Sequence, residues 1–195
     1  MPAAGAGSSY PAISRQAHRL AYISETFDAN VWAIRVGDDA GSGALPARLL
    51  SSTRIDFGAY YSPDGKRIVF NSDRTGTSGI WLSNADGSNP EPLFIHPEGA
   101  FSGSARWSPD GRHLAFDSYH DRNFDIFVIS ASGGEPFRLT THPTDDQVPS
   151  WSSDGKWVYF GSARTGRFEI WKTSAGGGEP VQVTTNGGHL EQFQL

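Results

Sequence analysis

The sequence predicts an all-β fold, a β-propeller of four-stranded antiparallel blades, from two observations: an internal repeat and the turn residues that separate short β-prone runs. The turn S-P-D-G at residues 62–65 recurs at 108–111 and, as S-S-D-G, at 152–155, in steps of 46 and 44 residues. Repeats of this length, made of short strands with frequent turns, are typical of propeller blades.

Other patterns keep the same register. The apolar triplet at 80–82 recurs at 126–128 and, with Lys172 as its last residue, at 170–172, and a Glu-Pro dipeptide follows each copy. A degenerate copy precedes these three; its strand residues survive at 20–22 and 31–33, but its turn has lost Pro, Asp and Gly. We therefore expect a disordered segment at residues 1–9, four four-stranded blades at about 10–55, 56–101, 102–145 and 146–189, and the first strand of a fifth blade at 190–195.

The third copy shows how each element follows from its residues. A first strand is predicted at 104–107, and S-P-D-G then turns the chain because Pro fixes φ, Asp bonds its local backbone and Gly accepts a positive φ. Further strands are predicted at 113–118, at 125–129 and, after a Gly-Gly turn, at 137–139. No window of about ten residues has the apolar period of a helix.

Composition narrows the class of function. The net charge of -5 and the absence of a basic cluster argue against nucleic-acid binding. No apolar run approaches the roughly 18 residues that a membrane span needs, and the first ten residues lack the features of a signal peptide. Cysteine is absent, which excludes disulfides, zinc sites with thiolate ligands and cysteine nucleophiles.

Aromatic residues occupy two equivalent positions of the repeat. We expect them to fill the space between blades, because a four-stranded sheet has two faces to bury. The first set comprises Trp32, Trp81, Phe127 and Trp171, and the second comprises Tyr61, Trp107 and Trp151.

The loops of such a protein divide between two faces. The S-P-D-G and Gly-Gly turns lie on one face, and the loops that enter strand one or join strands two and three lie on the other. The second group varies between copies and carries charge, and variable loops on a repeated scaffold are where function usually sits. The candidate partner-binding residues on that face are Asp56, Asp73, Arg74, His120, Asp121, Arg122, Asp145, Asp146 and Arg164.

The sequence carries no catalytic signature. It has neither a G-x-S-x-G elbow nor an H-E-x-x-H pair, and its six histidines are scattered among the copies. We expect no enzyme activity, no cofactor and no metal. A weak alternative is calcium at the channel mouth, where Asp56 and Asp145-Asp146 precede first strands, although Ser102 interrupts that ring.

The repeat resembles that of TolB-type, WD40-like propellers. The resemblance rests on W-S-P-D-G with its apolar run at 107–116, on the R-x-x-(D/E)-I-(W/F) segment at 122–127, and on G-G-E-P-x-x-L-T at 133–140. Similar propellers have six or seven blades, so the resemblance implies that this chain is part of one. It also implies a non-enzymatic scaffold that binds proteins, in the periplasm, although no signal peptide is present and the cytoplasm stays open.

Two other settings of similar propellers remain open: the non-catalytic portion of an oligopeptidase-like hydrolase, and the sensor domain of a winged-helix regulator. A partial ring also leaves blade faces and strand edges uncovered. We therefore expect self-association through those open edges.

Overall fold

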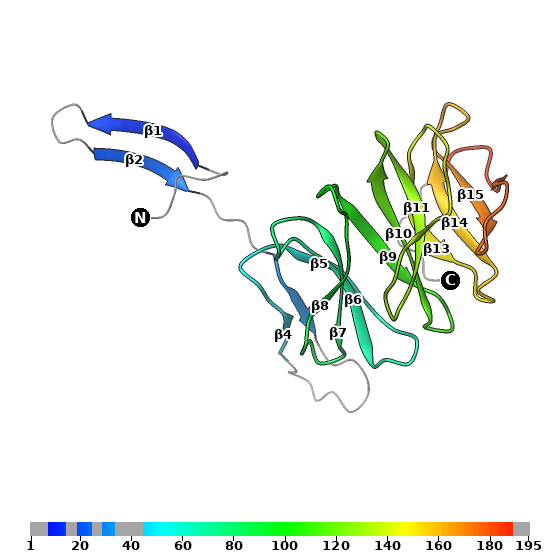
Figure 1. Ribbon diagram of the computed structural model, residues 1–195, viewed down its shortest axis with the longest axis horizontal. Coiled ribbons are helices and arrows are strands. Elements are labelled where there is room, and N and C mark those ends of the chain that lie inside the picture. The colour runs from blue at the N-terminus through cyan, green and yellow to red at the C-terminus, as the bar shows by residue number, and fades with distance from the viewer. Residues whose placement is uncertain (1–7, 15–18, 25–28, 34–44, 189–195) are drawn as a thin grey trace.

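The fold is a series of antiparallel sheets, seen in a computed structural model that describes residues 8–14, 19–24, 29–33 and 45–188. Three complete four-stranded sheets follow one another along the chain, each in simple meander order. They stand side by side in Figure 1. Their strands are β5 (Asp56–Tyr61), β6 (Arg67–Ser72), β7 (Gly79–Asn84), β8 (Glu91–Ile95), β9 (Ser102–Trp107), β10 (His113–His120), β11 (Asn123–Ser130), β12 (Phe137–Arg138), β13 (Asp146–Trp151), β14 (Trp157–Ser162), β15 (Glu169–Ser174) and β16 (Val181–Gln182).

The first copy departs from the prediction of one four-stranded blade. Among the described residues, β1 (Ser8–Ser14) and β2 (Arg19–Ser24) pair only with each other, and β3 (Val31–Ala33) and β4 (Ala47–Leu50) form a second two-stranded sheet. The β1–β2 hairpin lies apart from the other sheets (Figure 1). This copy lacks the S-P-D-G residues that fix the turn elsewhere, and a three-residue strand offers few ladder hydrogen bonds.

Two other predictions fall at the chain ends. The segment predicted as disordered, 1–9, includes Ser8 and Ser9, which belong to β1; residues 1–7 lie outside the described part of the chain. The predicted strand at 190–195 also lies outside it.

The S-P-D-G turn is held by a closed circuit of hydrogen bonds. The Ser108 hydroxyl donates to Asp110 Oδ1 at 2.6 Å and accepts from the His113 amide at 2.9 Å. The same Oδ1 accepts from the Arg112 amide at 3.0 Å. Gly111, at a φ of 67°, donates its amide to the Ser108 carbonyl at 2.9 Å. These four hydrogen bonds all lie within residues 108–113, so they form without a partner from a neighbouring sheet.

The same circuit recurs at residues 62–67 and 152–157. In each copy the pKa of the turn aspartate is lowered, first by hydrogen bonding from the turn serine and then by hydrogen bonding from the backbone amide two residues further on. These aspartates are Asp64, Asp110 and Asp154. The lowered pKa of the turn aspartate therefore recurs in all three copies, together with the hydrogen bonds that cause it.

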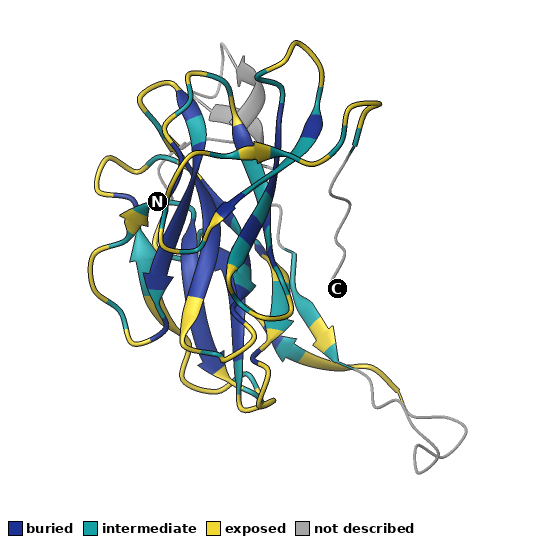
Figure 2. Cartoon of the chain, turned by 90° about the vertical axis from the view of Figure 1, so that its right-hand side faces the viewer, coloured by how far each residue is buried: buried dark blue, intermediate teal, exposed yellow. Residues whose placement is uncertain are grey.

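Adjacent sheets bury apolar faces against each other. Val69, Ile80 and Leu82 of the β5–β8 sheet pack on residues of the next sheet that include Leu114 and Phe116. The equivalent residues 115, 126 and 128 pack on Trp151, Val158 and Phe160 of the sheet after it. Figure 2 shows this buried interior running through the strands, with exposed residues confined mainly to the loops.

Most of the predicted interblade aromatics lie where expected. Trp81, Phe127, Trp107 and Trp151 are buried, and Trp171 packs against the apolar cluster that the β9–β12 and β13–β16 sheets share. Two belong to the junction with the divergent first copy and are exposed instead: Tyr61 by 50% and Trp32 by 55%, the latter beneath the Arg48 guanidinium.

Polar groups also cross between sheets. The indole of Trp107 donates to the carbonyl of Tyr60 at 3.0 Å, and that of Trp151 donates to the carbonyl of Arg106 at 3.1 Å. Each bond joins the first strand of one sheet to the first strand of the sheet before it. Since indole N–H groups are donors only, burial without such a carbonyl would be costly.

First strands also share a bulge. The pairing register shifts once in β5, β9 and β13, and the bulged residues Gly58, Ser104 and Val148 have φ of 61°, 54° and 53°. A β-branched residue is strained there. Asp117 of the preceding sheet holds Val148 in place by accepting its amide at 2.9 Å.

The turn circuit makes stability depend on acid pH. Because the folded-state pKa of each turn aspartate is lowered, its stabilisation is complete above the unfolded-state pKa of about 3.9 and is lost as pH falls through the folded-state value. We predict that the triple variant Asp64→Asn, Asp110→Asn, Asp154→Asn loses less stability than the parent chain between pH 5 and pH 3. Urea midpoints at the two pH values measure this, and equal losses would contradict it.

Candidate binding face

The variable loops gather at one edge of the sheets. The start of each first strand pairs with the end of each second strand, as in Asp56 with Ser72, Ser102 with Ser118 and Asp146 with Ser162. The connections at these ends form what we call the variable-loop face: residues 73–78, 96–101, 119–124, 141–145 and 163–168. The nine predicted site residues all lie on this face or at its margin, but the structure gives them different roles.

Four of the nine form two buried ion pairs. Arg74 Nη2 lies 2.9 Å from Asp56, and Arg164 Nη2 lies 2.8 Å from Asp146; both aspartate side chains are fully buried. Each guanidinium also covers aromatic rings of its own sheet, and Arg164 lies 4.6 Å from the Trp171 centroid. These pairs tie strand one to the loop after strand two. Within each blade the charge of the arginine is neutralised by that of the buried aspartate, so these side chains stabilise the blade and are not available to a binding partner.

The middle sheet replaces both members of this pair. Ser102 stands in place of the aspartate and hydrogen bonds to Ser118 at 2.8 Å, and His120 stands in place of the arginine. The His120 ring packs edge-on against Phe127, with centroids 6.2 Å apart. Because both charges are lost together, no buried ion is left without a counterion.

Two further candidates hold loops to strands. Asp73 accepts the Ile55 amide at 2.8 Å, and Asp145 accepts the Phe124 amide at 2.9 Å. Asp121 is exposed at a hairpin tip, where it pairs with Arg138 at 3.0 Å and lies 3.3 Å from His120. Arg138 pairs in turn with the buried Asp125, whose pKa is raised by burial against the opposing effect of that guanidinium.

Arg122 differs from the other eight. It is exposed, and its side chain makes no hydrogen bond or ion pair with the residues that the structure describes. Its φ is 76°, and that of Asp121 is 50°, so both tip residues occupy the left-handed region. The repeat places Gly76 and Gly166 at the position of Arg122, with φ of 95° and 92°. A long cationic side chain therefore occupies a backbone conformation that favours glycine.

Aromatic rings flank this tip. Phe101 and Tyr119 are each 41% exposed, and their ring centroids lie 6.0 and 5.3 Å from that of Phe124, both edge-on. We call these three residues the aromatic patch. Sequence reasoning missed it; the available signal was that the neighbouring copies have Asp73 and Ala163 at the position of Tyr119.

The aspartates considered for calcium do not converge. Asp56 and Asp146 point into separate blades toward their own arginines, and Asp145 accepts a backbone amide. Among the described residues, no group of three or more histidines and carboxylates is placed to hold a metal ion. That part of the chain also contains no helix long and apolar enough to cross a membrane.

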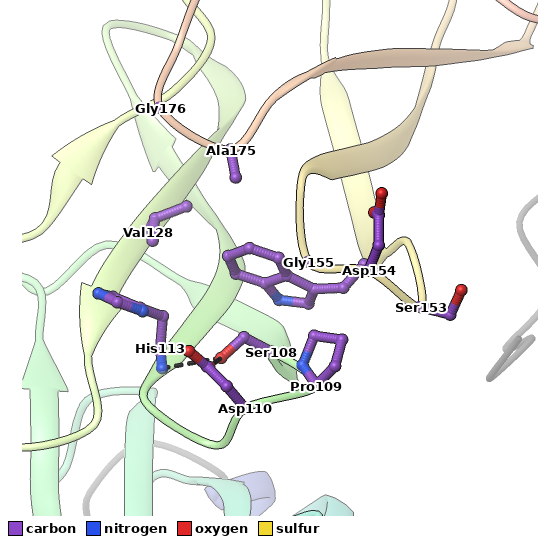
Figure 3. A pocket seen from close by; sticks show the side chains of 11 residues that line it. Ser108, Pro109, Asp110, His113, Val128, Ser153, Asp154, Gly155, Ala175 and Gly176 are labelled. Atoms are coloured by element: carbon purple, nitrogen blue, oxygen red, sulfur yellow. Dashed lines mark hydrogen bonds between the residues drawn. The ribbon is translucent and has the colours of Figure 1, made fainter.

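The opposite face, which carries the S-P-D-G turns, has cavities. One, of about 610 Å³, lies between the β9–β12 and β13–β16 sheets; Asp110 and His113 line one side and Asp154 the other (Figure 3). Both carboxylates already accept from turn serines, and the dashes that reach Ser108 in Figure 3 mark hydrogen bonding within this turn, including that from the His113 amide. This cavity is a gap that blade packing leaves between two turns.

Comparison with known proteins identifies the repeat. A family model described as "TolB beta propeller domain" matches residues 97–194, half of the chain. The Tol-Pal system protein TolB of Anaeromyxobacter dehalogenans is 37% identical over 67 residues, which are 34% of this chain and 14% of that protein. The putative TolB of Agrobacterium tumefaciens superposes with a TM-score of 0.69 at 26% identity, covering 92% of this chain and 62% of that one. The chain thus spans less than two thirds of either relative.

Two enzymes share the fold at lower identity. A puromycin hydrolase superposes with a TM-score of 0.65 at 17% identity, covering 80% of this chain and 27% of its own. An oligogalacturonate lyase superposes with a TM-score of 0.60 at 20% identity, covering 77% and 42%. At these identities the likeness concerns the fold alone.

The buried pairs should be structural, and substitution tests this. We predict that Asp146→Asn, which leaves Arg164 without a carboxylate, lowers the free energy of unfolding by about 3 kcal/mol. Lys156→Ala removes an exposed pair with Asp154 and should cost less than about 1 kcal/mol. Urea unfolding measures both, and equal costs would show that the buried pair has no special structural role.

Proposed function

Because the chain belongs to the family of TolB beta propeller domains, whose model matches half of it, we propose that it is a non-enzymatic scaffold that binds a protein partner through the variable-loop face. Arg122 carries the proposal. Left-handed backbone at a non-glycine residue costs free energy, of the order of 1 kcal/mol or more, and such strain concentrates at functional positions. A guanidinium without an intramolecular partner is available for an external one.

The surroundings of Arg122 support a protein partner. The aromatic patch lies beside it, and aromatic and arginine side chains together are enriched in the residues that contribute most to protein–protein binding. The β10–β11 hairpin that carries Arg122 has strands of eight residues, against six in the equivalent hairpins on either side. The proposed interface is therefore the tip of a well-paired hairpin.

We place this binding in the periplasm, on the resemblance to TolB proteins. The proposal of a non-enzymatic role draws on the same resemblance and on the lack of a nucleophile or metal motif in the sequence. The hydrolase and the lyase that share the fold do not favour the alternative that this chain is part of a hydrolase, because each is at most 20% identical to it.

We also propose self-association through open blade faces. The outer face of the last sheet carries a charge that makes this association depend on ionic strength. On the face of β13–β16 turned away from the preceding sheet, Lys172 Nζ lies 4.5 Å from the Trp157 ring and 6.0 Å from the Tyr159 ring. The inner sheets have Leu82 and Val128 at the position of Lys172. Since two such faces would oppose their ammonium groups, pairing of like faces should strengthen with salt, which sedimentation at two ionic strengths measures.

The substitution Arg122→Gly separates binding from folding. Glycine relieves the left-handed strain, so we predict that the free energy of unfolding rises by about 0.5–1 kcal/mol. Because glycine also removes the guanidinium, we predict that partner capture falls. Capture is measured with the immobilised chain in bacterial envelope extract, with captured proteins identified by mass spectrometry and retested in purified form.

The matched control is Arg112→Ala, which removes an exposed charge on the opposite face. It should capture the same proteins as the parent chain. If the Arg122→Gly chain retained all of them, or if the control lost them equally, the assignment of binding to the variable-loop face would be wrong.

A further inference from the structure

A second cavity opens on the S-P-D-G face, away from the proposed binding face. It has a volume of about 380 Å³ and lies where the ends of β5, β9 and β13 meet. These are the first strands of three successive sheets, the strands nearest the propeller axis. The residues that give the cavity its character are Tyr60, Tyr61, Arg106, Trp107, Ser150 and Trp151.

The repeat divides these residues into two groups. Tyr61, Trp107 and Trp151 are equivalent and aromatic in every sheet, which is what a structural position requires. Tyr60, Arg106 and Ser150 are also equivalent, yet they are a phenol, a guanidinium and a hydroxyl. The three first strands therefore bring different chemistry to one cavity from the same position of a repeated scaffold. Each follows the bulged residue of its strand by two positions, and bulges often re-aim side chains at sites.

Arg106 is the charged group of this cavity. Its Cζ lies 3.9 Å from the centroid of the Tyr60 ring, and its Nη1 donates to the Ala105 carbonyl at 3.0 Å. Stacking and this bond fix the plane of the guanidinium. The aromatic ring supports the cation by its face while the remaining N–H groups lie at the edge, which is the geometry in which arginine binds planar anions.

This guanidinium lacks a carboxylate partner. The partly buried Arg74, Arg138 and Arg164 each pair with a buried aspartate, whereas Arg106 belongs to none of the ion pairs formed by the described residues. Burial lowers the pKa of Arg106, against smaller opposing effects of Tyr60 and Asp117. Asp117 is itself buried and accepts the Val148 amide, and burial raises its pKa. A half-buried cation is thus left for an anion from outside.

We propose that this cavity is a carboxylate-binding site, in which Arg106 binds the carboxylate and the Tyr60, Tyr61, Trp107 and Trp151 rings contact the carbon skeleton attached to it. Guanidinium and carboxylate match in plane and spacing, and the aromatic walls favour an organic acid over a bare inorganic anion. The carboxylate comes from a small organic acid or from an acidic side chain of a peptide.

The test titrates the full chain with succinate, with the capped peptide acetyl-Gly-Glu-Gly-amide, with succinamide and with inorganic phosphate. Calorimetry and tryptophan fluorescence report binding, since two indoles line the cavity. We expect saturable binding of succinate or the peptide at millimolar concentration or below, and none of succinamide. Tighter binding of succinate would indicate a small organic acid as the natural ligand, and tighter binding of the capped peptide would indicate an acidic side chain. Phosphate binding equal to that of succinate, or no saturation with either carboxylate, would overturn the proposal.

Two variants locate the site. Arg106→Gln should weaken carboxylate binding by about tenfold or more, and Tyr61→Ala, which changes a half-exposed wall and keeps the guanidinium, should weaken it less while the chain stays folded. Arg112→Ala, an equal loss of charge on the same face, should bind as the parent chain does. Unchanged binding in both cavity variants, or an equal loss in the control, would overturn the assignment. Partner capture through Arg122 is a separate measurement, so either proposal can fail alone.

Discussion

The structure depends on the burial of two apolar faces per sheet. A four-stranded sheet with Val69, Ile80 and Leu82 on one side cannot be covered by its own loops, so it must stack on another sheet. Stacking then sets the polar contacts that cross between sheets. The indoles of Trp107 and Trp151 reach carbonyls of the preceding first strand, which aligns the first strands around the axis. The axial cavity and the variable-loop face are both consequences of that alignment.

In the divergent first copy the turn residues are lost and one strand is short, and in the part of the chain that the structure describes its β1–β2 hairpin does not pair with β3 and β4.

The charged residues near the variable-loop face are of two kinds, those paired with a buried counterion and those without one. Asp56, Arg74, Asp146 and Arg164 carry formal charges at the margin of the variable-loop face, but they are neutralised inside the blades and stack on aromatic rings. Arg122 carries a charge that nothing in the described structure neutralises, on a backbone conformation that glycine adopts in the neighbouring copies. A charge that has a buried counterion stabilises the fold; one that has none is available for binding. Arg106 likewise lacks the buried aspartate with which Arg74, Arg138 and Arg164 are paired.

The repeat also separates scaffold from function by comparison within one chain. Positions that keep the same residue in the three four-stranded sheets, such as the turn serine and aspartate, make the same bonds each time. Positions that differ in one copy are either compensated, as Ser102 with His120 replaces aspartate with arginine, or left uncompensated, as at Arg122 and Arg106. Only the uncompensated differences need an explanation outside the fold.

The sequence by itself determined the all-β class and, for the three copies that keep the turn residues, the four-stranded meander, the positions of the strands and the turn chemistry. It could do so because these depend on residues within one repeat: the serine, aspartate and glycine of each turn bond to partners at most five positions away. The tertiary structure alone decided which polar groups meet between sheets, because Asp117 accepts the amide of Val148, which lies 31 positions along the chain in the next sheet. It also decided that Arg106 stacks on Tyr60, one repeat away, without a carboxylate. Pairing across sheets depends on how the sheets stack, and a pattern within one repeat does not specify which side chains then meet.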